Sequence, residues 1–216
     1  QLATVYNIYN TLNAGDFSLY TEYNYKTPEA SWSDLERTKL INDDGSVFFA
    51  SLSYSRPKFG VTLQYKRVEN FDFRTSPLET NNDGYITFIP SLSRLNTYRL
   101  TGRYIPAAIL IGETGAQADI FWKIGDHQIN INYADIRNLN NLRLYQEIYL
   151  EDRWKINKKL SANLGIQYLK YNQEVYLFEP GLGVLDAITP FAEFLYKINR
   201  RQSLKAEFSQ MTTEED

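Results

Sequence analysis

The chain has 216 residues, enough for one large all-β domain or two small domains. It contains no cysteine and a single histidine, His127, so the sequence excludes disulfides, thiolate metal sites, cysteine nucleophiles and Ser-His triads. The formal net charge is −3, from 23 basic and 26 acidic residues, and no long basic run occurs. Nucleic-acid binding is therefore not expected.

The composition favours β structure over helix. Aromatic residues make up 15% of the chain, with 17 Tyr and 12 Phe, and these residue types fit pleated strands. The longest apolar run, IPAAILI at 105–111, has 7 residues, whereas a transmembrane helix needs about 20. No membrane-spanning helix is predicted.

Alternation of apolar and polar residues with a period of two is the main signal along the chain. In the segment 17–26, for example, Phe17, Leu19, Tyr23 and Tyr25 share one face while polar residues fill the other. The same alternation predicts about twelve strands. In chain order they are 1–10, 17–26, 46–55, 58–67, 84–92, 95–105, 114–124, 127–136, 142–156, 160–173, 186–198 and 202–211.

Short and long connections alternate between these strands. The short ones are NAGD, RPK, GD, INKK and NRR, and the long ones include 27–45, 68–83 and 174–185. This arrangement is typical of an up-and-down barrel in an outer membrane. All short turns can lie on one side only if an even number of strands separates them, so 84–92 is predicted as a strand although Pro90 would weaken it.

One motif occurs three times, as FWKIGDH at 121–127, RWKINKK at 153–159 and LYKINRR at 195–201. In each copy an aromatic residue, Trp122, Trp154 or Tyr196, stands two positions before an isoleucine at a tight turn. Aromatic residues at one height above the short turns predict the interface girdle of a membrane barrel. The alternative is a soluble lipocalin-like β-barrel that binds a small apolar ligand, with these aromatics closing its ends.

The polar faces of the strands carry many full charges. We expect such charges to pair across strands around a wet lumen, or to form a surface that selects ions. Arg99 and Arg103 would favour anions unless Asp119 cancels them. The predicted lumen-lining residues are Glu22, Lys26, Lys66, Arg99, Arg103, Asp119, Lys123, Glu147, Glu151, Arg153, Lys155, Glu193, Lys197, Lys205 and Glu207.

Two features need separate explanations. Asp152 shares the apolar face of Leu150 and Trp154, so either a bulge turns it inward or its surroundings contact a partner. The acidic loops INDDGS at 41–46 and TNNDGY at 80–85 could bind Ca²⁺, but Asx-Gly turns explain them without a metal. No catalytic residue, metal site or cofactor is predicted.

Three stretches, KRVENFDFRT, FIPSLSRLNTY and GETGAQADIFWKI, resemble a family of outer-membrane β-barrel proteins from Bacteroidota that are longer than this chain. The resemblance runs from about residue 58 to the end. It implies a porin-like barrel fold and a bacterial outer-membrane location. It supplies no catalytic residues.

The sequence thus predicts a single all-β domain over residues 1–216, a transmembrane antiparallel up-and-down β-barrel. Because both ends would fall on the long-loop side, we expect a fragment of a longer chain and a larger barrel of at least about 14 strands. The predicted function is a porin-like channel or the barrel subunit of an envelope complex, without catalysis. The predicted partners are outer-membrane lipid and other envelope proteins.

Overall fold

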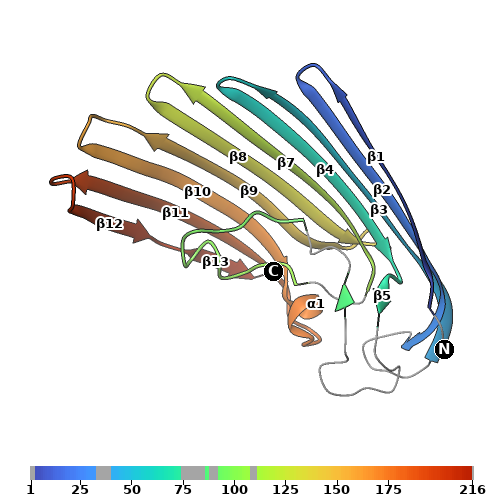
Figure 1. The fold of residues 1–216 in the computed structure, drawn as a ribbon. Helices are drawn as coiled ribbons and strands as arrows, with labels where there is room; N and C mark the ends of the chain where they lie inside the picture. Colours follow the sequence, from blue (N-terminus) through green and yellow to red (C-terminus); the bar gives the residue numbers. More distant parts are fainter. Residues whose placement is uncertain (1–2, 33–39, 74–85, 88–91, 108–110, 216) are drawn as a thin grey trace.

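The computed structural model describes residues 3–32, 40–73, 86–87, 92–107 and 111–215. An antiparallel sheet of 11 strands dominates it, in the order β1-β2-β3-β4-β7-β8-β9-β10-β11-β12, with β13 pairing with β11 (Figure 1). These strands are β1 (Val5–Ala14), β2 (Phe17–Trp32), β3 (Leu40–Arg56), β4 (Phe59–Glu69), β7 (Glu113–Ile124), β8 (His127–Asn138), β9 (Arg143–Trp154), β10 (Leu160–Asn172), β11 (Val184–Lys197), β12 (Ser203–Ser209) and β13 (Thr212–Glu215). β5 (Asp72–Phe73) and β6 (Ile86–Thr87) form a separate pair, and α1 spans Gln173–Leu177.

The sheet is strongly curved and open. Figure 1 shows it as a trough, with β1 and β12 at opposite edges. The prediction of an all-β, antiparallel, up-and-down sheet is confirmed. β1 pairs only with β2 and β12 only with β11, so the described strands do not close into a barrel. No helix among the described residues has the length and apolar character to cross a membrane.

The short turns gather at one end of the sheet, as predicted. They join β1 to β2, β3 to β4, β7 to β8, β9 to β10 and β11 to β12, and Figure 1 shows all five on the same side. Gly15 and Gly125 adopt positive φ angles of 60° and 58°, which the tight NAGD and GD turns require. We call this side the short-turn end and the opposite side the long-loop end.

The strand predicted at 95–105 is wrong. The segment 92–107 instead runs through turns, in which the Gly102 N–H donates to the Tyr98 carbonyl (3.1 Å). β4 pairs directly with β7, for example through Val61 and Ile120, so two strands separate the RPK and GD turns instead of four. The even-number argument is satisfied without the extra pair. Of the predicted strand 84–92, the described residues 86–87 form a strand, and 84–85 and 88–91, including Pro90, lie outside the described residues.

Other strand boundaries also differ from the prediction. β2 and β3 extend well into the predicted loop 27–45, and their pairing continues past a register shift between Lys26 and Glu29. The predicted strand 202–211 corresponds to β12 alone, and β13, which begins just beyond it at Thr212, follows β12 along β11. The strands of the sheet are therefore longer on the β2–β3 side than the alternation alone indicated.

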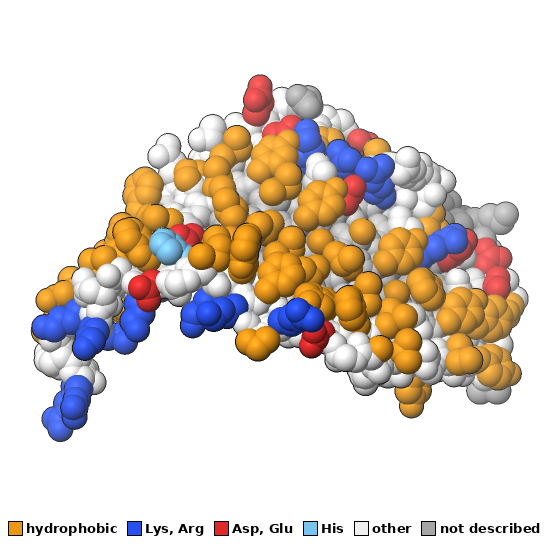
Figure 2. Space-filling model, turned by 90° about the horizontal axis from the view of Figure 1, so that it is seen from above, with side chains coloured by type: hydrophobic (Ala, Val, Ile, Leu, Met, Phe, Trp, Pro, Cys, Tyr) orange, Lys and Arg blue, Asp and Glu red, His pale blue; other side chains and the backbone are white. Residues whose placement is uncertain are grey.

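Most of the outer, convex face of the sheet is apolar and exposed, although ion pairs such as Lys170–Asp186 also lie on it. Leu63, Leu164 and Phe194 are 48%, 41% and 45% exposed, and the remaining strands contribute further large apolar side chains to the same face. Figure 2 shows apolar side chains spread over much of the surface seen from above. The concave face, in contrast, contains the buried side chains, including Lys66 and Glu147.

The buried part of the concave face has two regions. At the long-loop end an apolar cluster forms where Tyr176 of α1 packs over the sheet. Its other members are Ala134, Ile136, Leu144, Tyr145, Leu169, Tyr171, Leu185 and Ala187. Polar and charged side chains form the other region, with Glu151 and Glu193 over β9–β11 and the Lys66–Glu113 pair where β4 meets β7. The inner face is therefore not uniformly polar, which differs from the simple alternation of the sequence.

Candidate functional site on the concave face

The segment 92–107 lies across the concave face, in front of β9, β10 and β11 (green in Figure 1). Tyr98 and Thr101 are buried against the sheet, whereas Arg99 and Arg103 are exposed. This spacing of three matches a run of turns, in which every third side chain faces the same way. We call this piece of chain the inner segment.

Aromatic packing anchors the inner segment. The Tyr98 ring lies 4.3 Å from the Phe191 ring, centroid to centroid, and Phe191 in turn stacks on Tyr149 at 5.5 Å. Gly165 leaves the space that Phe191 occupies, because a Cβ atom there would overlap the Phe191 ring and the Leu150 carbonyl. The missing side chain on β10 thus shapes the platform on which Tyr98 rests.

Polar contacts add to this anchor. The carbon of the Arg94 guanidinium lies 3.4 Å from the centroid of the Tyr149 ring, a cation–π contact. The Tyr98 hydroxyl donates to Glu193 (3.3 Å) and accepts from the Asn163 amide. Burial, together with the nearby Glu193 carboxylate, raises the pKa of the Tyr98 phenol. Tyr98 therefore stays protonated and remains a donor.

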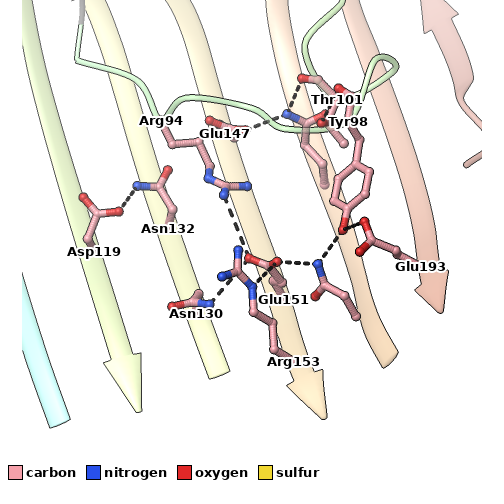
Figure 3. Close-up of polar contacts among 12 residues, drawn as sticks. Arg94, Tyr98, Thr101, Asp119, Asn130, Asn132, Glu147, Glu151, Arg153 and Glu193 are labelled. Carbon is pink, nitrogen blue, oxygen red and sulfur yellow. Dashed lines mark hydrogen bonds and ion pairs between the residues drawn. The ribbon is translucent and has the colours of Figure 1, made fainter. Parts of the chain in front are cut away.

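Glu151 is the centre of the polar network drawn in Figure 3. Its carboxylate accepts from Arg153 Nε (2.9 Å), Asn163 Nδ2 (2.6 Å) and Asn130 Nδ2 (3.5 Å), and the Arg94 guanidinium lies 4.0 Å away. A buried carboxylate is tolerated when donors surround it in this way. The network ties the inner segment to three adjacent strands.

A second buried carboxylate lies toward the middle of β9. Gln167 Nε2 donates both to Glu147 Oε1 (2.6 Å) and to the Thr101 carbonyl (3.0 Å), so it links sheet and inner segment. On the neighbouring strands Asn132 Nδ2 donates to Asp119 (2.6 Å). The concave face thus holds its charges in a hydrogen-bonded layer (Figure 3).

Two lysines are buried on the β2–β4 side of the same face. Lys66 forms an ion pair with Glu113, and the two side chains are 1% and 8% exposed. Lys26 lies 3.5 Å from Glu29 and its Nζ lies 5.5 Å from the Phe73 ring centroid. Long cationic side chains this deeply buried need a partner of opposite charge, and each of them has one.

The register places most of the predicted lumen-lining residues on the concave face. Lys66 is in the same row as Glu22, and the Glu193 row runs through Arg153 to Lys123. Those on this face are Glu22, Lys26, Lys66, Asp119, Lys123, Glu147, Glu151, Arg153, Lys155, Glu193, Lys197, Lys205 and Glu207. Arg99 and Arg103 are different, because they belong to the inner segment and to no strand.

A cavity of about 500 Å³ opens at the short-turn end of the concave face. The inner segment forms one wall through Thr97 and Tyr98, and the ends of β9, β10, β11 and β12 form the others. Six basic side chains line it: Arg153, Lys155, Lys158, Lys159, Lys197 and Lys205.

The three aromatic residues of the repeated motif all lie exposed on the convex face beside the short turns. Trp122 packs edge-on against Phe59 (6.3 Å between centroids), and Trp154 stacks on His127 (5.3 Å). Tyr196 occupies the corresponding place on β11, opposite Leu160. The strand register places the three aromatics in three different rows, each two residues before the isoleucine of its own turn, and the interface girdle stays a prediction.

Asp152 keeps its place on the convex face. The pairing of β9 with both neighbours is continuous through Asp152, so no bulge turns it inward. Its carboxylate instead lies 2.7 Å from His127 Nδ1 on the adjacent strand. Asp152 thus has a partner within the sheet, and a contact of its surroundings with another protein stays a prediction.

Several residues of the site were missed by the sequence analysis. Arg94 and Tyr98 lie in a segment predicted to be part of the wall or its connections, so their inward contacts could not be anticipated. Glu113 falls at the start of β7, one residue before the predicted boundary. Asn163 and Gln167, in contrast, follow the polar parity of β10, and that alternation was the signal available for them.

Among the described residues, no group of three His, Asp or Glu side chains is placed to hold a metal ion. No protein with a curated description matches the chain. A family model does match, over residues 1–216, and it is described as a family of unknown function, DUF6029. The chain therefore belongs to the family of unknown function DUF6029.

Proposed function

We propose that the curved sheet is part of the wall of a bacterial outer-membrane β-barrel, with lipid on its convex face and an enclosed aqueous space on its concave face. The observation that carries this proposal is the inverted polarity of the sheet. Leu63, Leu164 and Phe194 are exposed outside, while Lys66 and Glu147 are buried inside. Lipid-facing and lumen-facing residues alternate in this sense in membrane barrels.

The size of the exposed apolar surface also supports lipid on the convex face. Soluble proteins rarely expose a contiguous apolar patch above about 300–600 Å². Here β1–β4 and β7–β12 all add large apolar side chains to one face. A soluble lipocalin-like barrel would place those side chains inside and the ion pairs outside, and the pairs around Glu151 and Lys66 lie on the concave side instead.

The inner segment is the observation on which we base the kind of barrel that we propose. It occupies the concave face over β9–β11 and is fixed there by Arg94, Tyr98 and Thr101. An open porin would leave this space to water. We therefore favour a porin-like channel whose lumen the inner segment obstructs. The same obstruction favours, as a second candidate, a barrel subunit of an envelope complex that conducts poorly by itself.

The test combines location with conductance. The protein should fractionate with outer membranes and require detergent for extraction, and in planar bilayers it should show small or rare conductance steps. Tyr98→Ala should increase the conductance, because it removes both the Phe191 contact and the hydrogen bond to Glu193. Leu95→Ala is the control, since Leu95 is 94% exposed. A protein that stays monodisperse in buffer without detergent would refute the membrane proposal.

A further inference from the structure

Positive charge is concentrated in the cavity at the short-turn end. Its lining holds the six basic side chains named above and only two carboxylates, Asp126 and Glu193, so positive charges exceed negative ones by four. The whole chain carries a net charge of −3. The cationic character is therefore a local property of this site and does not follow from the composition of the protein.

Only part of this charge is neutralised within the protein. Arg153 pairs with Glu151 at 2.9 Å, and Lys205 pairs with Glu193 at 2.6 Å. The other four, Lys155, Lys158, Lys159 and Lys197, form no ion pair with any residue that the structure describes. Like charges held near one another repel, so a counter-anion would lower the energy of this arrangement.

Hydrogen bonds hold the backbone of several of these lysines in place. The Lys197 N–H donates to the Lys159 carbonyl (2.8 Å), which places these two residues side by side on neighbouring strands. The Lys155 N–H donates to the Asp126 carbonyl (2.9 Å). In the β9–β10 turn, Asn157 Oδ1 accepts from the backbone of Lys159 at 2.8 Å. The backbone of Lys155, Lys159 and Lys197 is therefore held by hydrogen bonds at the rim of the cavity.

The cavity also has the size and the polar groups of a ligand site. Its volume of about 500 Å³ lies within the usual range of small-molecule pockets, roughly 300–1,000 Å³. Ser161 and Asn163 on β10 and Thr97 on the inner segment add groups that form hydrogen bonds. A neighbouring cavity of about 580 Å³ shares Lys159 and Lys197 and adds Arg200 and Arg201. Together the two cavities accommodate more than one anionic group.

We propose that this site binds a polyanion carrying at least two phosphate-type groups, held by the lysines of the β9–β10 turn and the end of β11. Lysine suits such a ligand, because its ammonium group is a compact charge with three rotatable donors and binds phosphate oxygens well. A single monovalent anion would neutralise one of the four available lysines and leave the others repelling one another. A ligand in this cavity would also lie near the hydrogen bond between the Tyr98 hydroxyl and Glu193, which holds the inner segment.

Binding of inorganic pyrophosphate to the full chain, measured by isothermal titration calorimetry at low ionic strength, tests the site. The wild-type protein should bind, and Lys159→Gln/Lys197→Gln should weaken the affinity about tenfold, because two charge contacts are lost. The matched control Lys58→Gln/Arg67→Gln removes the same charge away from the cavity and should change the affinity less than about twofold. Circular dichroism establishes that both variants are folded.

Two results would overturn the proposal: absence of pyrophosphate binding by the wild type, or equal loss in the pocket and control variants. The source of the anionic groups is decided by a competition arm. If nanodiscs containing phosphatidylglycerol displace pyrophosphate and phosphatidylcholine nanodiscs do not, the ligand is a lipid headgroup. If neither displaces it, the ligand is a soluble polyanion. Because calorimetry measures binding without any measurement of conductance, a negative result would refute the anion site and leave the channel proposal unaffected.

Discussion

At the scale of single residues, the deeply buried lysines of the concave face lie beside carboxylates. Lys66 and Glu113 show this most clearly, because both are almost fully buried. The sequence analysis assigned Lys66 to the inner face from alternation alone. It could not name Glu113 as the partner, because cross-strand register is not encoded in the period of either strand.

Replacing Lys66 alone tests this pair. Lys66→Met should destabilise the protein by about 3–5 kcal/mol, because it leaves the buried Glu113 carboxylate without its cation. The double variant Lys66→Met/Glu113→Leu should recover most of that loss. Urea unfolding followed by tryptophan fluorescence measures both. If the double variant is as unstable as the single one, the ion pair is not the source of the effect.

Gly165 provides a second residue-scale prediction. Gly165→Val places a branched side chain against the Phe191 ring and the Leu150 carbonyl, and overpacking of this kind costs about 1–3 kcal/mol. Gly60→Ala is the matched control, since its nearest neighbour, the Tyr54 carbonyl, lies 3.8 Å from the added Cβ. The midpoint of urea unfolding should fall for the first variant and barely change for the second.

At the scale of elements, most strands of the large sheet were predictable and the inner segment was not. Alternation places Leu63 and Leu164 on one face of β4 and β10, and the structure has both there. In the inner segment, Tyr98, Leu100 and Tyr104 fit a period of two, whereas Tyr98, Thr101 and Tyr104 fit a period of three. Short apolar patterns satisfy both periods, and only contacts with Phe191 and Gln167 select the second.

The attachment of the inner segment can be measured by proteolysis. Arg99 and Arg103 are exposed trypsin sites on an otherwise fixed piece of chain. Tyr98→Ala should raise the cleavage rate there several-fold, because local opening becomes easier when the aromatic anchor is lost. Leu95→Ala retains both arginines and all anchor contacts, so its cleavage rate should match that of the wild type. Equal rates in both variants would show that Tyr98 does not hold the segment.

At the scale of the whole molecule, an added charge should destabilise the protein more on the convex face of the sheet than on the concave face. Leu63→Arg puts a cation on the convex face and should cost about 2–4 kcal/mol in a lipid-inserted protein. Gln64→Arg, at the next position of β4, points to the concave face and should cost much less. The yield of folded protein in lipid vesicles distinguishes them. A larger loss for Gln64→Arg would mean that the convex face does not meet lipid.

Orientation can be measured because the described residues contain no cysteine. In outer-membrane barrels the long loops face outward and the short turns face the periplasm. Asp43→Cys, at the long-loop end, should therefore react with a membrane-impermeant maleimide on intact cells. Asp126→Cys, in the β7–β8 turn, should react only after the membrane is permeabilised. The reverse pattern would place the sheet upside down.

The length of β2 and β3 has a consequence for such a wall. They have 16 and 17 residues, whereas a tilted strand crosses the hydrocarbon with about 9–11. About six residues of each strand would then continue past the lipid, and at 3.3 Å per residue with a tilt near 45° they would rise roughly 14 Å above it. Such a barrel would therefore project farther from the outer surface of the membrane on the β2–β3 side than elsewhere, and antibodies, phages or neighbouring cells would meet that side first.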